Sequence, residues 1–152
     1  MATAYIGLGS NLGDREATLR GALARLNASP GIRVLAVSRF RETEPVGFTD
    51  QPKFVNAAAA VETELEPRLL LEALLAIERA MGRTREGPRF GPRTIDLDLL
   101  LYEDRVVDEP GLRIPHPRLH ERAFVLEPLA DLDSALIVPG LGPLATLTRN
   151  LE

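Results

Sequence analysis

Two acidic residues, Asp96 and Asp98, interrupt an otherwise apolar run from Ile95 to Leu101. In a β-strand successive side chains point to opposite faces, so the two carboxylates would share one face and their apolar neighbours the other. Two carboxylates on one face repel each other, and they would be costly to bury without a partner. The pattern therefore predicts a strand with one buried face, whose other face either holds a cation or is solvated.

A cation held by this acidic pair would be Mg²⁺. Mg²⁺ typically uses one or two protein carboxylates and completes its coordination with water and phosphate oxygens. Alternation of polar and apolar residues is also the usual pattern of a half-exposed strand. The pair alone does not decide between a metal site and a solvated face.

A cluster of arginines precedes the acidic pair. Residues 83–93 hold four arginines and one glutamate, in a chain whose net charge is −4. The guanidinium groups of Arg83, Arg85, Arg89 and Arg93 could each donate two hydrogen bonds to phosphate oxygens. A solvated basic loop is the alternative. Because carboxylates follow directly, the combination favours a site in which Mg²⁺ and arginines hold a nucleoside triphosphate.

The composition is that of an ordinary globular protein. The 152 residues are 45% hydrophobic and 26% charged, so we expect a single domain over residues 1–152. No apolar run has the length that a bilayer requires, and the N-terminus lacks the layout of a signal peptide, which predicts a cytoplasmic protein without a membrane partner. The absence of cysteine excludes disulfides, thiol catalysis and cysteine-ligated metals.

The predicted elements follow the order strand, helix, strand, strand, helix, strand. Strands are predicted at residues 4–9, 32–40, 54–63 and 94–102, and helices at 14–27, where Asp14 is the N-cap, and 67–82. This order is that of the ferredoxin-like split βαβ arrangement. We therefore expect an α+β fold, a ferredoxin-like βαββαβ core whose sheet is dominated by antiparallel pairs and carries both helices on one face.

Other segments complete the prediction. Residues 41–53 and 83–93 are predicted to be long irregular loops, and 105–107 a short strand. A C-terminal extension should contain a helix near 123–132 and short extended pieces from Leu136 onward. The glycine-rich segment 7–13 differs by one residue from a dinucleotide fingerprint and lacks the lysine of a P-loop, so a structural turn is favoured there.

The string from Arg89 to Leu100, R-F-G-P-R-T-I-D-L-D-L-L, resembles the signature of the 6-hydroxymethyl-7,8-dihydropterin pyrophosphokinases of folate biosynthesis. Further segments resemble the same family, so that the resemblance covers essentially the whole chain: 5–12 (Y-I-G-L-G-S-N-L), 50–58, 114–117 and 122–124. The resemblance implies transfer of pyrophosphate from MgATP to the hydroxymethyl oxygen of the pterin, with release of AMP. It implies ATP and the hydroxymethyl dihydropterin as substrates and two Mg²⁺ ions as cofactors. The net charge of −4 argues against a nucleic-acid partner, and we expect a monomer.

The resemblance also implies a role for each matching residue. Asp96 and Asp98 match the ligands of the two Mg²⁺ ions. The catalytic positions are Arg83 and Arg93; the ATP-binding positions are Arg85, Arg89, Leu99, His116 and Arg122; the pterin-binding positions are Thr43, Val46, Phe54, Asn56 and Phe124. In such a pocket the Asn56 amide would pair with the edge of the heterocycle, and the two phenylalanines would sandwich its ring. Without the resemblance, the same phenylalanines would be assigned to the core and His116 to a structural position.

The expected reaction is in-line attack of the pterin hydroxyl on the β-phosphorus of ATP, in which the protein mainly positions the substrates and stabilises charge. No residue stands out as a general base. The two long loops would act as lids that exclude water.

Two alternatives without ATP turnover share the expected fold: an RNA-binding module and a domain that binds a small regulatory ligand. An RNA-binding sheet needs exposed aromatic residues and a basic surface. This chain has five Phe, two Tyr and no Trp, with a negative net charge. The composition therefore argues against the RNA-binding module, whereas only an assay of ATP turnover separates the enzyme from the ligand-binding domain.

Overall fold

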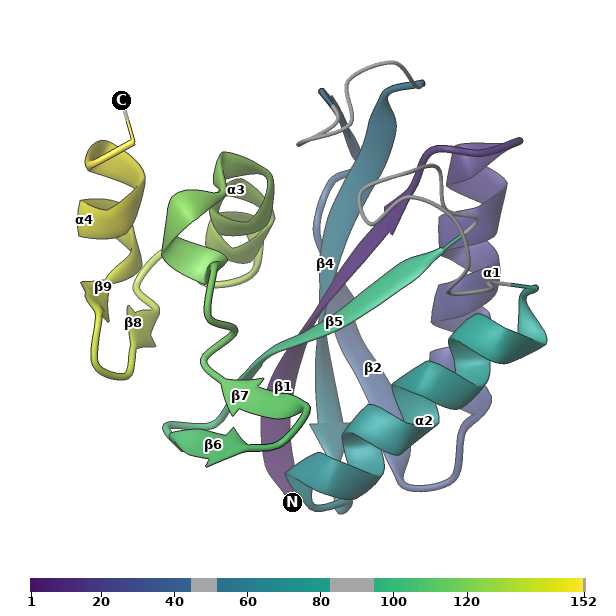
Figure 1. The fold of residues 1–152 in the computed structure, drawn as a ribbon, viewed down its shortest axis with the longest axis horizontal. Coiled ribbons are helices and arrows are strands. Elements are labelled where there is room, and N and C mark those ends of the chain that lie inside the picture. Colours follow the sequence, from purple (N-terminus) through teal and green to yellow (C-terminus); the bar gives the residue numbers. More distant parts are fainter. Residues whose placement is uncertain (45–51, 83–94, 152) are drawn as a thin grey trace.

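The computed structural model describes residues 1–44, 52–82 and 95–151, and these ranges combine helices with antiparallel sheet (Figure 1). The elements run in the order β1 (Ala2–Ser10), α1 (Arg15–Ala28), β2 (Ile32–Val37), β3 (Arg41–Thr43), β4 (Phe54–Thr63), α2 (Pro67–Ala80), β5 (Asp96–Tyr102), β6 (Val107–Glu109), β7 (Leu112–Ile114), a 3₁₀ turn (Leu119–Glu121), α3 (Ala123–Leu132), β8 (Ile137–Val138), β9 (Gly142–Pro143) and α4 (Leu144–Arg149). Among the helices of these ranges, none has the length and apolar character needed to span a bilayer.

The main sheet has the strand order β2-β4-β1-β5, and β3 pairs with β4 at one end. All of these pairs are antiparallel. The register of β1 places Gly9 between Asn56 of β4 and Asp96 of β5. Residues directly opposite on neighbouring strands share a face of the sheet, so these three positions form one row across it.

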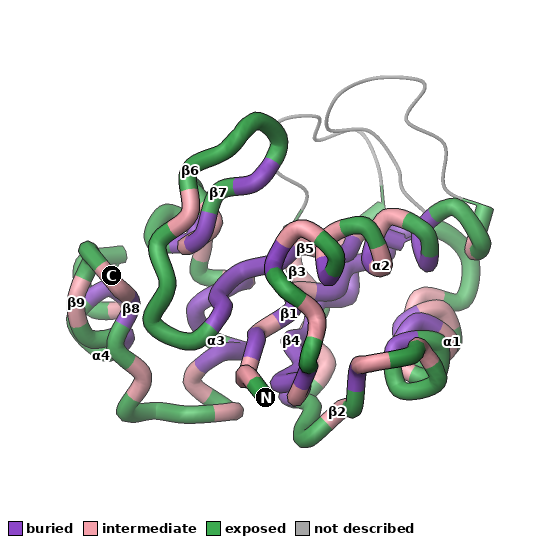
Figure 2. Tube along the Cα trace, turned by 90° about the horizontal axis from the view of Figure 1, so that it is seen from below, coloured by how far each residue is buried: buried purple, intermediate pink, exposed green. Residues whose placement is uncertain are grey.

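One face of the sheet is covered by α1 and α2 (Figure 1). Figure 2 shows buried positions along the central strands and on the inner sides of the helices. Large apolar residues from both layers form the core there: Ile6, Leu8, Leu19, Leu26, Val55, Leu70, Leu74, Ile95, Leu97 and Leu99. The Asp14 carboxylate caps α1 by accepting a hydrogen bond from the Ala17 N–H at 3.1 Å, as the sequence predicts.

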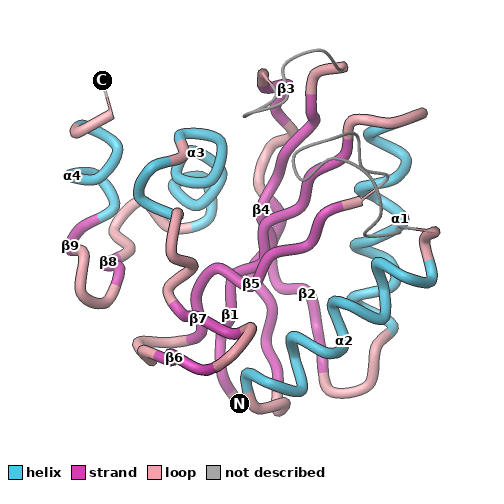
Figure 3. Tube along the Cα trace, viewed as in Figure 1, coloured by secondary structure: helices cyan, strands magenta, loops and turns pink. Residues whose placement is uncertain are grey.

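The other face of the sheet is only partly covered, by α3 and the C-terminal segment. A second apolar cluster joins these layers and includes Ala58, Leu100, Leu119, Leu126, Leu129 and Leu144. The small β8–β9 pair lies beside α4, away from the main sheet (Figure 3). Because α3 spans only part of the sheet, the ends of β1, β4 and β5 that carry polar residues lie beside it rather than beneath it.

Several predicted elements are confirmed with their bounds. The strand at residues 54–63 and the helix at 123–132 match β4 and α3. The run from Ala57 to Ala60 is extended despite its weak strand propensity, because alternate alanines are buried against the helices on one face and against α3 on the other. The coarse expectation of mixed helices and antiparallel sheet is also confirmed.

Two local predictions were wrong, and one helix was missed. Residues 41–43, predicted to belong to a loop, form β3 because they pair with Phe54 to Asn56 of β4. The strand predicted at 105–107 begins at Val107, since its partner is Leu112 to Ile114 across a tight turn. The short helix α4 was not predicted. Residues 41–43 and 107–109 are strands because they pair with other segments of the chain. The local sequence pattern carries no information about that pairing.

A bidentate ion pair joins β3 to α3 across the partly covered face. Arg41 donates to both carboxylate oxygens of Asp131, at 2.7 and 2.8 Å, and the Arg39 backbone N–H donates a third bond at 3.1 Å. The hydrogen bond from Arg41 is the main reason that the pKa of Asp131 lies below its usual value. This pair therefore stabilises the packing of α3 on the sheet while Asp131 is ionised.

Asp131→Asn should lower the free energy of unfolding by about 1 kcal/mol at neutral pH, because it removes the charged partner of Arg41. Since folding lowers the pKa of Asp131, its contribution is complete above the unfolded value of about 3.9 and is lost as the pH falls through the folded pKa. The difference between wild type and variant in urea unfolding should therefore shrink below about pH 4.

The matched control is Glu127→Gln, on the same helix. Glu127 lies 3.6 Å from Arg41 and is half exposed, so this substitution should change stability by less than about 0.5 kcal/mol. A cost of Asp131→Asn that stays constant from neutral to acidic pH would contradict the assignment.

Candidate functional site

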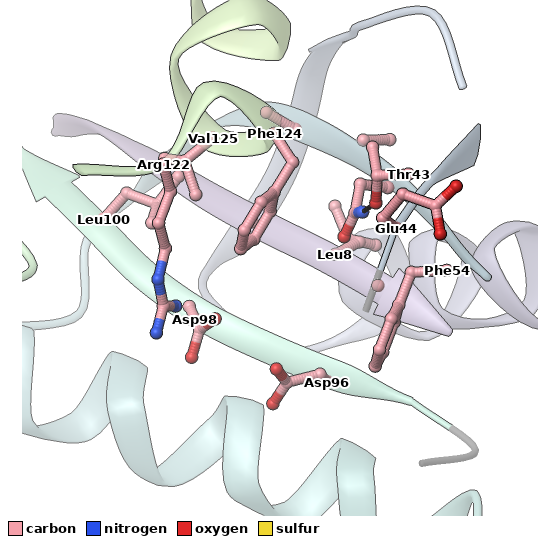
Figure 4. Close-up of a pocket in the computed structure, with 15 residues that line it drawn as sticks. Leu8, Thr43, Glu44, Phe54, Asp96, Asp98, Leu100, Arg122, Phe124 and Val125 are labelled. Carbon is pink, nitrogen blue, oxygen red and sulfur yellow. Dashed lines mark hydrogen bonds between the residues drawn. The ribbon is translucent and has the colours of Figure 1, made fainter. Parts of the chain in front are cut away.

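A pocket lies on the partly covered face of the sheet, between the ends of β1, β4 and β5 and the start of α3 (Figure 4). β3 closes its far side. Its lining combines a small-residue floor, two aromatic rings, an amide and an acidic pair: Gly7, Leu8, Gly9, Thr43, Glu44, Phe54, Asn56, Ala57, Ala58, Asp96, Asp98, Leu100, Arg122, Phe124 and Val125.

Glycines of β1 form the floor. Gly9 lies between Asn56 and Asp96, and Gly7 between Ala58 and Asp98, in two successive rows across the sheet. Because neither glycine carries a side chain, a trough runs along β1 between its neighbours. The trough is tightest at Gly9, where an added Cβ would lie 2.7 Å from Oδ1 of Asn56.

One end of the pocket presents an amide between aromatic rings. Asn56 is 7% exposed, and its Nδ2 donates a hydrogen bond to Oγ1 of Thr43 on β3. This bond fixes the orientation of the amide, which carries a second N–H donor and a carbonyl acceptor. Phe54 lies on the β3 side of the pocket and Phe124 on the α3 side (Figure 4). A flat, polar heterocycle fits such an arrangement of rings and amide.

The other end of the pocket is acidic. Asp96 and Asp98 are both half-buried and project from the pocket face of β5, as the alternation predicts. Arg122 extends from the start of α3 toward Asp98 (Figure 4), and its guanidinium stacks on the ring of Phe124 at 5.4 Å. Burial lowers the pKa of Arg122, an effect that Asp98 opposes, but a guanidinium remains charged at neutral pH.

His116 lies close to this acidic end. Its backbone N–H donates to the Leu100 carbonyl at 2.9 Å. Burial lowers the pKa of its ring most, Arg122 lowers the pKa further, and Asp96 opposes the shift. The imidazole is therefore neutral at neutral pH. The Arg118 backbone N–H donates to Nδ1 at 3.2 Å. This bond assigns the ring proton to Nε2, which is therefore a hydrogen-bond donor.

The acidic pair suits Mg²⁺ by its donor chemistry. The described ranges contain no cluster of three or more histidine, cysteine or acidic side chains that would enclose a metal. Two carboxylates with an open pocket beside them provide the hard oxygen donors that Mg²⁺ prefers, together with room for phosphate oxygens and water. A site built in this way depends on a phosphate-bearing ligand to complete it.

The structure brings together seven of the residues predicted to form the site: Thr43, Phe54, Asn56, Asp96, Asp98, Arg122 and Phe124 all line the pocket. His116 is their neighbour. The side chain of Leu99 is 5% exposed and packs in the core on the helix-covered face, so it does not reach the pocket. The remaining predicted positions lie outside the described residues: Val46, Arg83, Arg85, Arg89 and Arg93.

Sequence reasoning missed the floor of the pocket and its rim at Glu44. Gly7 and Gly9 are two residues apart, and this spacing places both on one face of a strand. The alternation was a usable signal, but it was assigned to a turn. The Glu44 carboxylate, just after β3, lies 3.3 Å from Nζ of Lys53, just before β4. No local sequence pattern indicates this ion pair.

The lining of the pocket has the chemistry that would suit a flat small molecule beside a divalent cation and a phosphate group. Comparison with known proteins identifies the family. Residues 5–134 match the family model described as 7,8-dihydro-6-hydroxymethylpterin-pyrophosphokinase (HPPK). The chain belongs to this family.

Curated relatives of this chain are named as pyrophosphokinases of the same pterin. The 2-amino-4-hydroxy-6-hydroxymethyldihydropteridine pyrophosphokinase of Methylorubrum extorquens is 53% identical over 140 residues, which is 92% of this chain and 88% of the relative. That of Bacillus subtilis is 50% identical over 129 residues, 85% of this chain and 77% of the relative. The predictions of the family and of a pyrophosphokinase of folate biosynthesis that acts on ATP and a hydroxymethyl dihydropterin are confirmed.

Solved structures share the fold. A Plasmodium falciparum HPPK-DHPS crystallised with pteroate matches with a TM-score of 0.77 at 15% identity. An HPPK-DHPS in complex with substrates matches with a TM-score of 0.75 at 13% identity. Each match covers 98% of this chain, and the chain spans 42% and 43% of those longer chains. At this identity the match concerns the fold alone.

Proposed function

We propose that the pocket between the sheet and α3 is the active site, where the pyrophosphoryl group of ATP is transferred to the hydroxymethyl oxygen of 6-hydroxymethyl-7,8-dihydropterin. The observation that carries this proposal is the row of Asn56, Gly9 and Asp96 across the sheet. It puts an amide suited to a heterocycle and a carboxylate suited to a metal at opposite ends of one trough. A pterin at the amide end would point its substituent toward the acidic end.

The pterin would lie between Phe54 and Phe124, with its polar edge on Asn56. Ring stacking on both faces orients a flat heterocycle, and the amide distinguishes its donor and acceptor groups. Thr43 holds the Asn56 amide in place, so its role would be to support that contact. Val46, which lies outside the described residues, remains a predicted part of the same subsite.

The phosphates of ATP would lie at the acidic end. Two Mg²⁺ ions held by Asp96 and Asp98 would neutralise phosphate charge and polarise the bonds that change. Arg122 lies beside Asp98 and would bind phosphate oxygens, and His116 would donate a hydrogen bond from Nε2. Leu99 could contribute only backbone atoms, because its side chain is buried on the other face of the sheet.

In the proposed reaction the hydroxyl oxygen of the pterin forms a bond to the β-phosphorus of ATP. The bond between that phosphorus and the α,β-bridging oxygen breaks, and AMP leaves with the bridging oxygen while the hydroxyl loses its proton. The chain contributes orientation, because stacking and the amide hold the hydroxyl in line with the phosphates. Arg122 contributes positive charge where negative charge develops. Arg83 and Arg93 as catalytic groups, and Arg85 and Arg89 as ATP contacts, remain predictions.

The finer description of the fold is also a proposal. The strand order β2-β4-β1-β5 and the antiparallel pairing support a ferredoxin-like βαββαβ core, with the segment beyond β7 as its C-terminal extension. Two apolar clusters share the sheet as a common layer, which supports a single domain. A monomer, a cytoplasmic location and the absence of a nucleic-acid partner remain predictions.

Incubation of the purified chain with MgATP and 6-hydroxymethyl-7,8-dihydropterin should yield AMP and the pterin pyrophosphate in equal amounts. ADP as the nucleotide product would refute pyrophosphoryl transfer, and an unchanged ATP pool would favour a ligand-binding domain. Chromatography of the nucleotides, with the pterin product detected by fluorescence, distinguishes these results.

Asp96→Ala should lower kcat at least about a hundredfold, because it removes a carboxylate from the proposed metal and phosphate site. The control is Asp104→Ala, an exposed acidic residue just beyond the same strand, whose kcat should match that of wild type. Equal rates in Asp96→Ala and wild type would exclude a metal role for Asp96.

Gly9→Ala should weaken pterin binding about tenfold or more, because overpacking typically costs about 1–3 kcal/mol and the added methyl must displace the Asn56 amide. The control is Gly21→Ala on α1, outside the pocket, in which the added Cβ would meet the Met81 side chain at an ordinary 3.6 Å. Calorimetric titration with the pterin, and thermal unfolding of both variants, separate loss of the subsite from loss of the fold. Equal pterin affinities in the two variants would contradict the proposed position of the heterocycle.

A further inference from the structure

A buried carboxylate contacts the backbone between the two aspartates of β5. Glu78, in the last turn of α2, is only 2% exposed. Its Oε2 accepts a hydrogen bond from the Leu97 N–H at 2.8 Å. Leu97 separates Asp96 from Asp98 in the sequence, so this bond is made at the centre of the acidic segment.

The Leu97 N–H is available to a side chain because of the position of β5. Within the described ranges β5 pairs with β1 alone and is the last strand of its sheet. In an antiparallel edge strand every second N–H points away from the neighbouring strand. α2 packs alongside this edge (Figure 1), and Glu78 reaches the outward N–H of Leu97.

The helix itself gives no reason for an acidic residue here. The C-terminal end of a helix carries partial negative charge, so Glu78 is disfavoured by the helix dipole. Burial of a carboxylate adds a further cost. The hydrophobic residues of α2 that face the core, such as Leu74 and Ile77, show that an apolar side chain packs in this layer. A glutamate at this position therefore implies a function outside the helix.

We propose that Glu78 is a positioning residue for the proposed metal site, which it serves by holding the β5 backbone in register between Asp96 and Asp98. The proposal rests on the proposed function of those aspartates. Without the acceptor, the N–H of Leu97 would be buried and unsatisfied, and the strand would shift to find another partner. Asp96 and Asp98 project from the backbone on either side of this bond, so a shift would change the separation of their carboxylates.

The test measures metal binding rather than turnover. The probe is Mn²⁺ together with α,β-methylene-ATP. In this analogue a CH₂ group replaces the oxygen between the α- and β-phosphorus, so the bond that pyrophosphoryl transfer would break is absent. Free Mn²⁺ is followed by electron paramagnetic resonance during titration of the protein. The variants are Glu78→Leu, which removes the acceptor, Glu78→Gln, which keeps a carbonyl oxygen, and Glu72→Gln, an exposed acidic residue on the same helix.

Glu78→Leu should bind Mn²⁺ at least about tenfold more weakly than wild type, as removal of groups that orient metal ligands typically does. Glu78→Gln should stay within about threefold of wild type, because the amide oxygen still accepts from Leu97. Glu72→Gln should be unchanged. Pterin binding in the absence of nucleotide should be unchanged in all three variants, which a general loss of structure would not allow.

Two results would overturn the proposal. If Glu78→Gln binds Mn²⁺ as weakly as Glu78→Leu, the charge of Glu78 rather than its hydrogen bond is required. If Glu78→Leu binds Mn²⁺ normally, the residue has no positioning role. Asp96→Asn, measured in parallel, separates this failure from that of the proposed function, because unchanged Mn²⁺ binding in that variant would refute the metal site itself. Should Glu78→Leu not fold, Glu78→Asp, whose shorter side chain cannot reach Leu97, replaces it.

Discussion

The register of β1 between β4 and β5 is the constraint on which the site depends. Because Gly9 stands between Asn56 and Asp96, the amide and the carboxylate face one trough with no side chain between them. A shift of one residue in the pairing of β5 would turn both carboxylates toward α1 and α2, into an apolar core. The buried leucines on the opposite face oppose that shift. The core therefore helps to fix the position of the polar groups.

The second face of the sheet explains why a pocket exists at all. An apolar sheet face must be covered, and α3 covers it only where Ala58 and Leu100 offer apolar surface. Beyond that point the strands carry glycine, amide and carboxylate groups, which gain nothing from an apolar layer. The Arg41–Asp131 pair then holds the edge of α3 against β3, so that the walls bearing Phe124 and Thr43 stand at a fixed distance across the trough.

The sequence predicted the parts of this arrangement that local chemistry determines. The Asp14 cap, the bounds of β4 and α3, and the shared face of Asp96 and Asp98 follow from propensity and alternation. The resemblance to a family supplied the roles of residues such as Asn56, which periodicity does not reveal. Pairing between distant segments could not be predicted, and for this reason β3 was assigned to a loop. The contact of Glu78 with the Leu97 N–H could not be predicted either, because a bond to a backbone group has no sequence signature.

The electrostatics of the acidic end set a requirement on how ligands enter. Two carboxylates lie there near the guanidinium groups of Arg122 and Arg118, and burial lowers the pKa of the nearby His116 imidazole. Carboxylates and phosphates repel each other at short range. In the proposed site a divalent cation between them would turn this repulsion into attraction, so the nucleotide and the metal would stabilise each other's binding. The proposed pterin end presents a neutral amide and two neutral rings, and its charged rim residue, Glu44, is paired with Lys53. In the proposed site one trough thus joins a subsite whose occupancy would depend on the cation to a subsite whose occupancy would depend on shape and hydrogen bonding.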